Sequence, residues 1–195
     1  MFLDEKTKSE LKQTISNSGV IAYVTDTVWG LGCNPDDEKA VKKIYEIKKR
    51  EPQKPLILMS CDMKYLLPYV QEIPKKAQQL IDKYFPGALT IILKKSDKTK
   101  NFITSNFDTV GIRIPNNAVF KEICETIDGH VLATTSANLS HEPSAKSYAQ
   151  ALENMGKKAD MVLEDYGQTC EGLESTVVLV QGDDVKVLRQ GAIVL

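Results

Sequence analysis

Positively charged and small polar residues recur in this 195-residue chain at the predicted ends of strands and helices. The cations are Lys48, Arg50, Lys54, Arg113 and Arg189, and the hydroxyl or amide groups belong to Thr27, Thr109, Thr134, Ser136, Asn138, Ser144 and Ser175. All of these groups can donate hydrogen bonds to phosphate and carboxylate oxygens, and the cations also attract the negative charge of those oxygens. The set contains no obvious general base, so it indicates a reaction catalysed by positioning and charge stabilisation.

The stretch 19–60 is predicted to form half of an anion-binding pocket. An apolar run at residues 20–24 predicts a strand, hydroxyl and carboxylate side chains follow at residues 25–27, and the Gly-Leu-Gly sequence at 30–32 predicts a bend. A second apolar strand is predicted after Pro55. Strand and helix ends leave backbone groups unpaired and let side chains converge, which is where α/β proteins bind ligands.

A helix is predicted between the bend and the second strand. Asn34 can cap its N-terminus, Pro35 suits the first helical position, and Lys48, Lys49 and Arg50 fall in its last turn. The helix dipole favours cations in that turn. A solvated face is therefore the alternative interpretation of these three residues.

Three later strands are predicted at residues 88–94, 109–114 and 131–135. Arg113 lies between Ile112 and Ile114, so the alternation of a strand places its side chain on the opposite face from both. The strand at 131–135 runs into the polar sequence Thr-Thr-Ser-Ala-Asn, whose side chains need partners if they are buried.

The rest of the chain is predicted as a loop, a helix and a hairpin. The loop covers the lysine-bearing residues 94–106, the helix runs from Pro143 and Ser144 to about Met155, and the hairpin covers residues 175–189 around Gly-Asp at 182–183. No internal repeat or low-complexity linker appears, so we expect one mixed α/β domain.

Composition narrows the function. Hydrophobic residues make up 42% of the chain and the formal net charge is -1, which argues against a protein whose main task is to neutralise phosphate backbones. No apolar run reaches the roughly 20 residues that a membrane span needs. The N-terminus lacks the pattern of a targeting segment, and no two cysteines form a C-x-x-C pair. We therefore expect a cytoplasmic protein with four reduced thiols, at Cys33, Cys61, Cys124 and Cys170.

Several common site types are absent from the sequence. His130 and His141 lie at no metal-ligand spacing, so no metal site within the protein is predicted. There is no P-loop motif and no G-x-S-x-G nucleophile motif. A dinucleotide fingerprint starting at Gly30 fails, because Pro35 stands where its third glycine would be.

Taken together, the motifs resemble the YrdC/Sua5/TsaC family of threonylcarbamoyl-AMP synthases. The resemblance runs in order through TDTVWGLG, IKKR and KPLILM within 25–59, FPGALTIIL at 85–93, TVGIRIP at 109–115, TSANLSHEPSA at 135–145, ESTVV at 174–178 and RQGAI at 189–193. It implies a single YrdC-like domain over residues 1–195. It also implies a twisted mixed parallel and antiparallel sheet flanked by helices, with a concave basic ligand site.

The resemblance also implies an activity, that of an ATP-dependent nucleotidyltransferase. L-threonine and bicarbonate or CO2 would give N-carboxythreonine, which attacks the α-phosphate of ATP, with Mg2+ on the phosphates and pyrophosphate as the leaving group. A separate transferase complex would use the product, threonylcarbamoyl-AMP, to modify an adenosine of tRNA. Weak binding of tRNA to this chain is compatible with that role, and binding to a membrane is not expected.

Site residues follow by matching motif positions. The K-x-R and S-x-N signature matches Lys48, Arg50, Ser136 and Asn138, which are the expected catalytic residues. The expected ATP contacts are Arg50, Lys54, Thr109, Ser136, Ser144 and Arg189, and the expected threonine contacts are Thr27, Arg113, Thr134 and Ser175.

The chain departs from the usual family pattern at Val24, Trp29, Lys54, Met59 and His141. Trp29 and Met59 bear on the amino-acid pocket, so one alternative is a paralogue of the YciO type that binds nucleotide with a different substrate. A second alternative is a module that binds double-stranded RNA or tRNA, against which the net charge of -1 counts. A carbamoyltransferase module of hydrogenase maturation is a third.

Overall fold

The computed structural model describes residues 1–195 and contains one nine-stranded sheet of order β7-β1-β2-β6-β3-β5-β4-β8-β9. The pairs β1–β7, β3–β5 and β4–β8 are parallel and the other five are antiparallel, so the predicted mixed sheet is confirmed. The strands are β1 Ile21–Tyr23, β2 Gly30–Cys33, β3 Ile57–Ser60, β4 Leu89–Lys94, β5 Thr109–Arg113, β6 Val131–Ser136, β7 Met161–Val162, β8 Thr176–Gln181 and β9 Asp184–Arg189.

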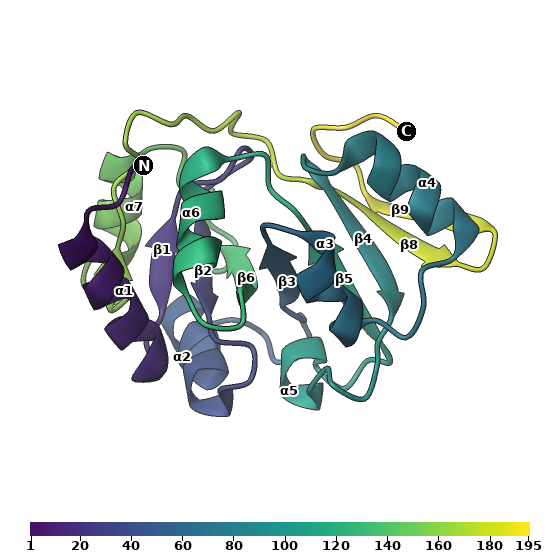
Figure 1. Cartoon of the computed structure of the whole chain (residues 1–195), viewed down its shortest axis with the longest axis horizontal. Helices are drawn as coiled ribbons and strands as arrows, with labels where there is room; N and C mark the ends of the chain where they lie inside the picture. Colours follow the sequence, from purple (N-terminus) through teal and green to yellow (C-terminus); the bar gives the residue numbers. More distant parts are fainter.

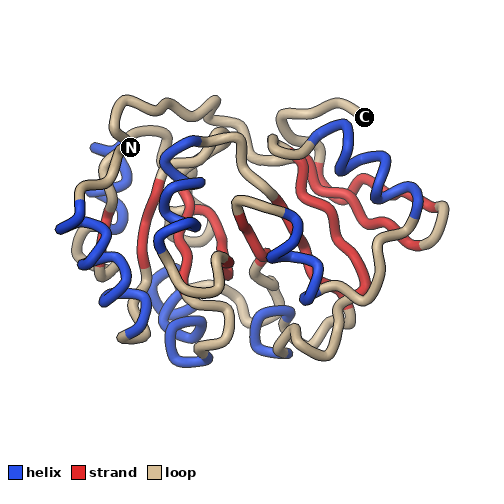
Figure 2. The backbone as a smooth tube through the Cα atoms, in the orientation of Figure 1, coloured by secondary structure: helices blue, strands red, loops and turns tan.

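Helices flank the sheet (Figure 1), and the strands form one curved row between them (Figure 2). The helices are α1 Glu5–Ser16, α2 Glu38–Lys48, α3 Met63–Leu66, the 3-10 helix η1 Leu67–Tyr69, α4 Lys75–Tyr84, α5 Asn101–Thr104, α6 Ala118–Thr126 and α7 Tyr148–Met155. A single cluster of 44 buried residues joins sheet and helices. None of the helices is long and apolar enough to cross a membrane.

The predicted bend at residues 30–32 is wrong, because these residues begin β2, which pairs with both β1 and β6. The reason is a close approach by the ring of Tyr23. A Cβ atom on Gly30 would lie 2.8 Å from Cε2 of Tyr23, and one on Gly32 would lie 2.8 Å from its hydroxyl oxygen. The two glycines therefore make room for an aromatic ring rather than for a turn.

The N-terminus of α2 also differs from the prediction. The Asn34 side chain accepts a hydrogen bond from the Asp36 amide at 2.9 Å and forms a turn. The Asp37 carboxylate is the actual cap and accepts from the amides of Lys39 and Ala40 at 2.9 and 3.1 Å. A carboxylate at this position satisfies free amide groups and complements the helix dipole.

The predicted helix start at Pro143 and Ser144 is wrong as well. Helix α7 begins at Tyr148, and the Ser147 hydroxyl caps it by accepting from the amide of Gln150. The residues before it are held to another loop, since the Ala145 carbonyl accepts from the amide of Trp29 at 3.0 Å. Ser144 therefore lies in a connecting segment, where its side chain can reach residues from elsewhere.

The lysine-bearing segment 94–106 is only partly the predicted loop, because it contains the short helix α5. Lys95 donates to the side chains of Asn101 and Thr104 at 2.5 and 3.2 Å. The predicted hairpin is confirmed as β8 and β9, and Gly182 in its turn has a φ of 58°, a conformation that suits glycine.

Candidate functional site

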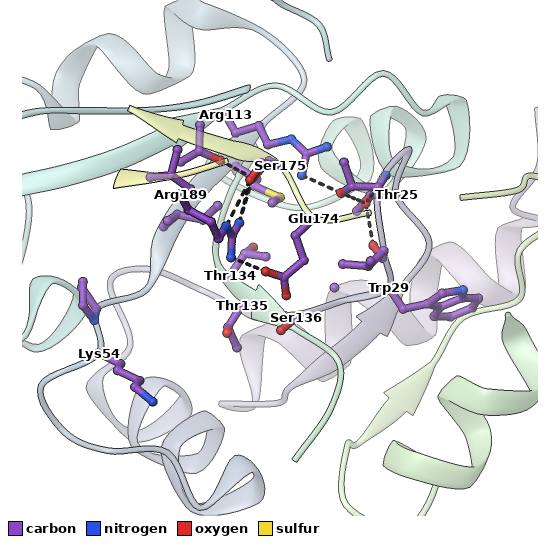
Figure 3. A pocket seen from close by; sticks show the side chains of 18 of the residues that line it. Thr25, Trp29, Lys54, Arg113, Thr134, Thr135, Ser136, Glu174, Ser175 and Arg189 are labelled. Atoms are coloured by element: carbon purple, nitrogen blue, oxygen red, sulfur yellow. Dashed lines mark hydrogen bonds and ion pairs between the residues drawn. The ribbon is translucent and has the colours of Figure 1, made fainter. Parts of the chain in front are cut away.

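A cavity of about 380 Å³ opens where the loop after β1 meets the ends of β6, β8 and β9. This volume falls within the range of small-molecule sites. Figure 3 shows side chains from these elements converging on it. Eight of the twelve predicted site residues line the cavity: Thr27, Arg50, Lys54, Arg113, Thr134, Ser136, Ser175 and Arg189.

Arg113 marks the buried end of this cavity. It is only 2% exposed, and its guanidinium donates to the Gly87 carbonyl at 3.0 Å, to the Thr27 hydroxyl at 2.8 Å and to Asp26 at 2.5 Å. Burial lowers the pKa of Arg113 and Asp26 opposes that effect, so the group stays a cation. Three of its five N–H donors have partners, which leaves two for a ligand. The prediction that Arg113 faces away from its strand neighbours is confirmed, since Arg113 lines the cavity whereas Ile112 and Ile114 belong to the hydrophobic core.

Hydroxyl groups form the wall next to Arg113. The Thr27 and Thr25 hydroxyls lie 3.1 Å apart, and those of Ser175 and Thr90 lie 2.8 Å apart. These four residues all line the cavity. Each hydroxyl of such a pair can accept one hydrogen bond and donate another, so the pair can form hydrogen bonds with the polar groups of a small ligand.

A buried tyrosine orients one further lining hydroxyl. The Tyr23 hydroxyl lies 2.6 Å from the hydroxyl of Thr134, and Tyr23 itself is fully buried. Burial raises the pKa of Tyr23, so the phenol is neutral. Sequence reasoning missed Tyr23. Its ring packs against Gly30 and Gly32 of the neighbouring strand β2, and this packing is what puts it under the cavity.

Both departures near the amino-acid pocket, Trp29 and Met59, line the cavity. The indole of Trp29 packs against the ring of Tyr148 at 5.9 Å between centroids. Figure 3 shows it pointing away from the other labelled side chains. The tryptophan thus fills the core beside α7, and its backbone is the part that lies at the cavity.

Arg189 and Glu174 face each other at the open end. The guanidinium of Arg189 donates through Nε and Nη2 to the Ser175 carbonyl at 3.2 and 2.9 Å, and its Nη1 forms an ion pair with Glu174. The other carboxylate oxygen of Glu174 accepts from the Ser144 hydroxyl at 3.2 Å. Sequence reasoning missed Glu174 as a site residue, although it stands directly before Ser175 in the ESTVV motif.

Arg50 and Lys54 complete the cationic groups. Arg50 donates to the carbonyls of Lys54 and Pro55, both at 3.0 Å, and has no carboxylate within 4.0 Å. Lys54 forms an ion pair with Glu51 at 3.1 Å. Three of the four lining cations therefore have a carboxylate partner. The basic character of the site stays a prediction.

The signature residues form a network beneath the cavity. The Lys48 ammonium donates to the carbonyls of Ser136 and Asn138, both at 2.6 Å, and to the Asn138 side chain at 2.9 Å. The Ser136 hydroxyl donates to the same side-chain oxygen at 2.6 Å. Asn138 also donates to the Glu142 carbonyl at 2.5 Å. Lys48 and Asn138 thus hold the loop after β6, while Arg50 and Ser136 reach the cavity.

Lys48 is 1% exposed, so the alternative interpretation of a solvated helix end is wrong for this residue. Burial lowers its pKa to about 7, with a smaller contribution from Arg50. The three acceptors around its nitrogen match the three donors of an ammonium group, so this cage binds the charged form.

Besides Lys48 and Asn138, two more predicted residues, Ser144 and Thr109, do not line the cavity. Ser144 lies at its rim and touches it only through Glu174. Thr109 begins β5 opposite Lys94, at the other end of the strand from Arg113, and the structure does not bring it to the other candidates.

Comparison with known proteins identifies relatives. The Sua5/yciO/yrdC family model, described as "Telomere recombination", matches residues 13–191. A threonylcarbamoyl-AMP synthase of Pyrococcus abyssi is 35% identical over 181 residues, which are 93% of this chain and 53% of that protein. One from Vibrio campbellii is 30% identical over 188 residues, which are 95% of this chain and 100% of that protein.

A solved structure shares the fold. The crystal structure of Pyrococcus abyssi Sua5 complexed with L-threonine matches with a TM-score of 0.90 at 34% identity, over 97% of this chain and 55% of that chain. The present chain therefore spans about half the length of the Pyrococcus protein.

Proposed function

Because the chain belongs to the Sua5/yciO/yrdC family, we propose that it is a threonylcarbamoyl-AMP synthase that uses L-threonine, bicarbonate or CO2, and ATP. The observation that carries this proposal is a single cavity with cations at both ends. Arg113 lies at its buried end, and Arg50 and Arg189 lie toward its mouth. Such a cavity can hold a carboxylate and a polyphosphate at the same time.

Threonine occupies the buried end in this proposal. Its carboxylate binds the two free donors of Arg113, and its hydroxyl bonds to Thr134 or Ser175. Thr27 fixes the guanidinium by accepting at 2.8 Å. Met59 supplies an apolar contact for the methyl group. A site that offers hydrogen bonds to a substrate hydroxyl discriminates strongly against analogues without one.

ATP occupies the open end. Arg50 and Arg189 contact its phosphates, with Lys54, Ser136 and Ser144 at the edges of the same region. Lys48 and Asn138 act through Ser136, whose backbone and side chain they hold. Thr109 has no contact in this proposal, because it does not line the cavity.

The reaction needs no nucleophile from the protein. The amine nitrogen of threonine bonds to the carbon of bicarbonate, and water leaves, which gives the carbamate. A carbamate oxygen then bonds to the α-phosphorus of ATP, the bond from that phosphorus to the bridging oxygen breaks, and pyrophosphate leaves with the electron pair. Arg50 and Arg189 stabilise the charge that develops on the phosphates, which is how phosphoryl-transfer sites commonly act.

Mg2+ fits this site as a companion of the nucleotide. The chain contains no cluster of three His, Cys, Asp or Glu side chains that could hold a metal ion, and Glu174 is the one carboxylate in the lining. Mg2+ commonly binds through substrate phosphates with few protein ligands. When bound, it would neutralise phosphate charge.

The product carries an activated acyl phosphate bond, so a separate transferase must consume it. We place that step, the formation of N6-threonylcarbamoyladenosine in tRNA, in the cytoplasm, where ATP and tRNA are available and the four free thiols would stay reduced. The chain would meet the transferase complex there, with tRNA binding to this chain weak at most.

Product analysis tests the proposal. The protein is incubated with ATP, Mg2+, L-threonine and 13C-bicarbonate, and the mixture is analysed by mass spectrometry. Threonylcarbamoyl-AMP carrying one 13C atom is the expected result. If labelled carbon never appears in an AMP adduct with threonine or with any other amino acid, the synthase proposal is wrong.

A further inference from the structure

Glu174 is the one acidic side chain in the cavity lining, and the synthase mechanism gives it no role. Its two carboxylate oxygens contact Arg189 and Ser144, both of which are predicted to contact ATP. Figure 3 shows the carboxylate directed toward Arg189, into the space between the elements that line the cavity. The carboxylate thus lies where a nucleotide phosphate would bind.

The ion pair of Glu174 can open. The Glu174 side chain is 39% exposed and the Arg189 side chain is 46% exposed. Exposed ion pairs of this kind contribute little to stability. The pair of Arg113 and Asp26 differs, because those side chains are only 3% and 15% exposed and Asp26 does not line the cavity. Of the two arginine–carboxylate pairs at the site, only that of Glu174 has its carboxylate in the cavity lining.

Arg189 keeps its place when Glu174 leaves. Its Nε and Nη2 atoms donate to the carbonyl of Ser175, and Nη2 also lies 3.3 Å from the Ser175 hydroxyl. Only Nη1 depends on the carboxylate. An incoming phosphate oxygen can therefore take the position of the carboxylate without rebuilding the guanidinium site.

We propose that Glu174 is an internal anion that occupies the Arg189 subsite in the nucleotide-free chain and is displaced by the polyphosphate of the substrate. This inference rests on the proposed function, because it takes Arg189 to be a phosphate contact. Glu174 then acts as a specificity-determining residue. It screens Arg189 from small anions that contact it alone, whereas a polyphosphate that also reaches Arg50 gains enough to displace the carboxylate.

The experiment measures binding of inorganic pyrophosphate by isothermal titration calorimetry at pH 8 in EDTA. It compares the wild type with Glu174→Gln, which keeps the side-chain shape and removes the charge. Glu171→Gln is the matched control, since Glu171 is exposed and its side chain has no partner. Glu174→Asp keeps the charge on a shorter side chain and serves as a second variant.

Glu174→Gln is expected to bind pyrophosphate about fivefold more tightly than the wild type, the change that corresponds to loss of an exposed ion pair. Glu174→Asp should fall between the two, and Glu171→Gln should match the wild type. Equal or weaker binding by Glu174→Gln would overturn the proposal. Weaker binding of ATP by this variant only in the presence of Mg2+, without tighter pyrophosphate binding in EDTA, would assign the carboxylate to the metal and also overturn it.

The readout separates this inference from the synthase proposal, because pyrophosphate binding requires no turnover. A wild type that forms threonylcarbamoyl-AMP while Glu174→Gln shows no gain in affinity contradicts the inference alone. A gain in affinity without product formation by the wild type contradicts the synthase proposal alone. Absence of pyrophosphate binding in every variant contradicts the inference.

Discussion

The ammonium nitrogen of Lys48 lies 2.6 Å from the carbonyl oxygen of Ser136. The first residue ends α2 and the second ends β6, so this bond ties a helix terminus to the strand end that carries a cavity hydroxyl. A second hydrogen bond joins the same two segments, since the Ser140 amide donates to the Lys48 carbonyl at 2.9 Å. The first part of the loop that follows β6, as far as Ser140, is therefore held by one lysine through both its side chain and its backbone.

Replacing Lys48 by methionine should destabilise the fold. The change keeps much of the side-chain length but leaves three buried acceptors without their donor, so we expect the free energy of unfolding to fall by about 2–4 kcal/mol. Urea unfolding measures it. Lys42→Met is the control, because Lys42 lies exposed on the same helix and should change stability by less than about 0.5 kcal/mol. Equal stability of Lys48→Met and Lys42→Met would mean that the cage does not hold the loop.

The two ends of the cavity should respond to different substrates. Arg113→Lys should raise the KM for threonine by about tenfold or more, because a lysine cannot replace the planar fork that contacts Gly87, Thr27 and Asp26. The KM for ATP should change by less than about twofold. Arg189→Lys should show the reverse pattern. Steady-state kinetics with each substrate varied in turn provide the test, and a parallel rise of both KM values in both variants would contradict the two-ended site.

Tyr23→Phe should weaken threonine binding without stopping catalysis. The variant removes the 2.6 Å contact to Thr134, whose hydroxyl is then left with a 3.4 Å contact to the Leu132 carbonyl. We expect the KM for threonine to rise about fivefold, the effect of one lost hydrogen bond, with kcat reduced less. Tyr166→Phe, remote from the cavity, is the control. An unchanged KM would show that Thr134 needs no orienting partner.

Cys61 should be the most reactive thiol. A hydrogen bond with the Cys124 thiol lowers the pKa of Cys61 to about 7, whereas burial raises the pKa of Cys33, Cys124 and Cys170. Because the thiolate is the nucleophile, alkylation by iodoacetamide should accelerate as the pH rises through about 7. Peptide mass spectrometry over pH 5.5–9 identifies the labelled residue.

Cys61→Ser should abolish this fast phase. If another cysteine reacts first, or if the midpoint lies near 9, the hydrogen bond with Cys124 does not favour the thiolate.

The sequence predicted the residues that meet in the cavity better than it predicted the elements that carry them. Alternation along β5 was enough to place Arg113 on the opposite face from Ile112, since that rule is local. The glycines of β2 resembled a turn, because nothing local shows that the ring of Tyr23 would lie over them. Such packing depends on which strands pair, and a single sequence does not reveal that.

Contacts between segments far apart in the sequence explain why the role of Glu174 and the inward direction of Lys48 were harder to predict. Ser144 and Glu174 are 30 positions apart, and their contact exists only because the segment before α7 and the start of β8 meet at the cavity rim. The inward direction of Lys48 depends on the loop after β6 supplying three acceptors. Helix-end charge preferences favoured a solvated lysine, and this distant loop outweighed them.

The central claim is that this cavity brings threonine and ATP together for synthesis of threonylcarbamoyl-AMP. Pyrophosphate release from ATP and bicarbonate, measured with and without L-threonine and with L-serine as the control, tests it most directly. The account predicts threonine-dependent release by the wild type and a loss of at least about tenfold in Ser136→Ala, because Ser136 lines the cavity and its hydroxyl bonds to Asn138. Lys42→Met should keep wild-type release. Release that is independent of threonine, or equal in the wild type and Ser136→Ala, would contradict the account.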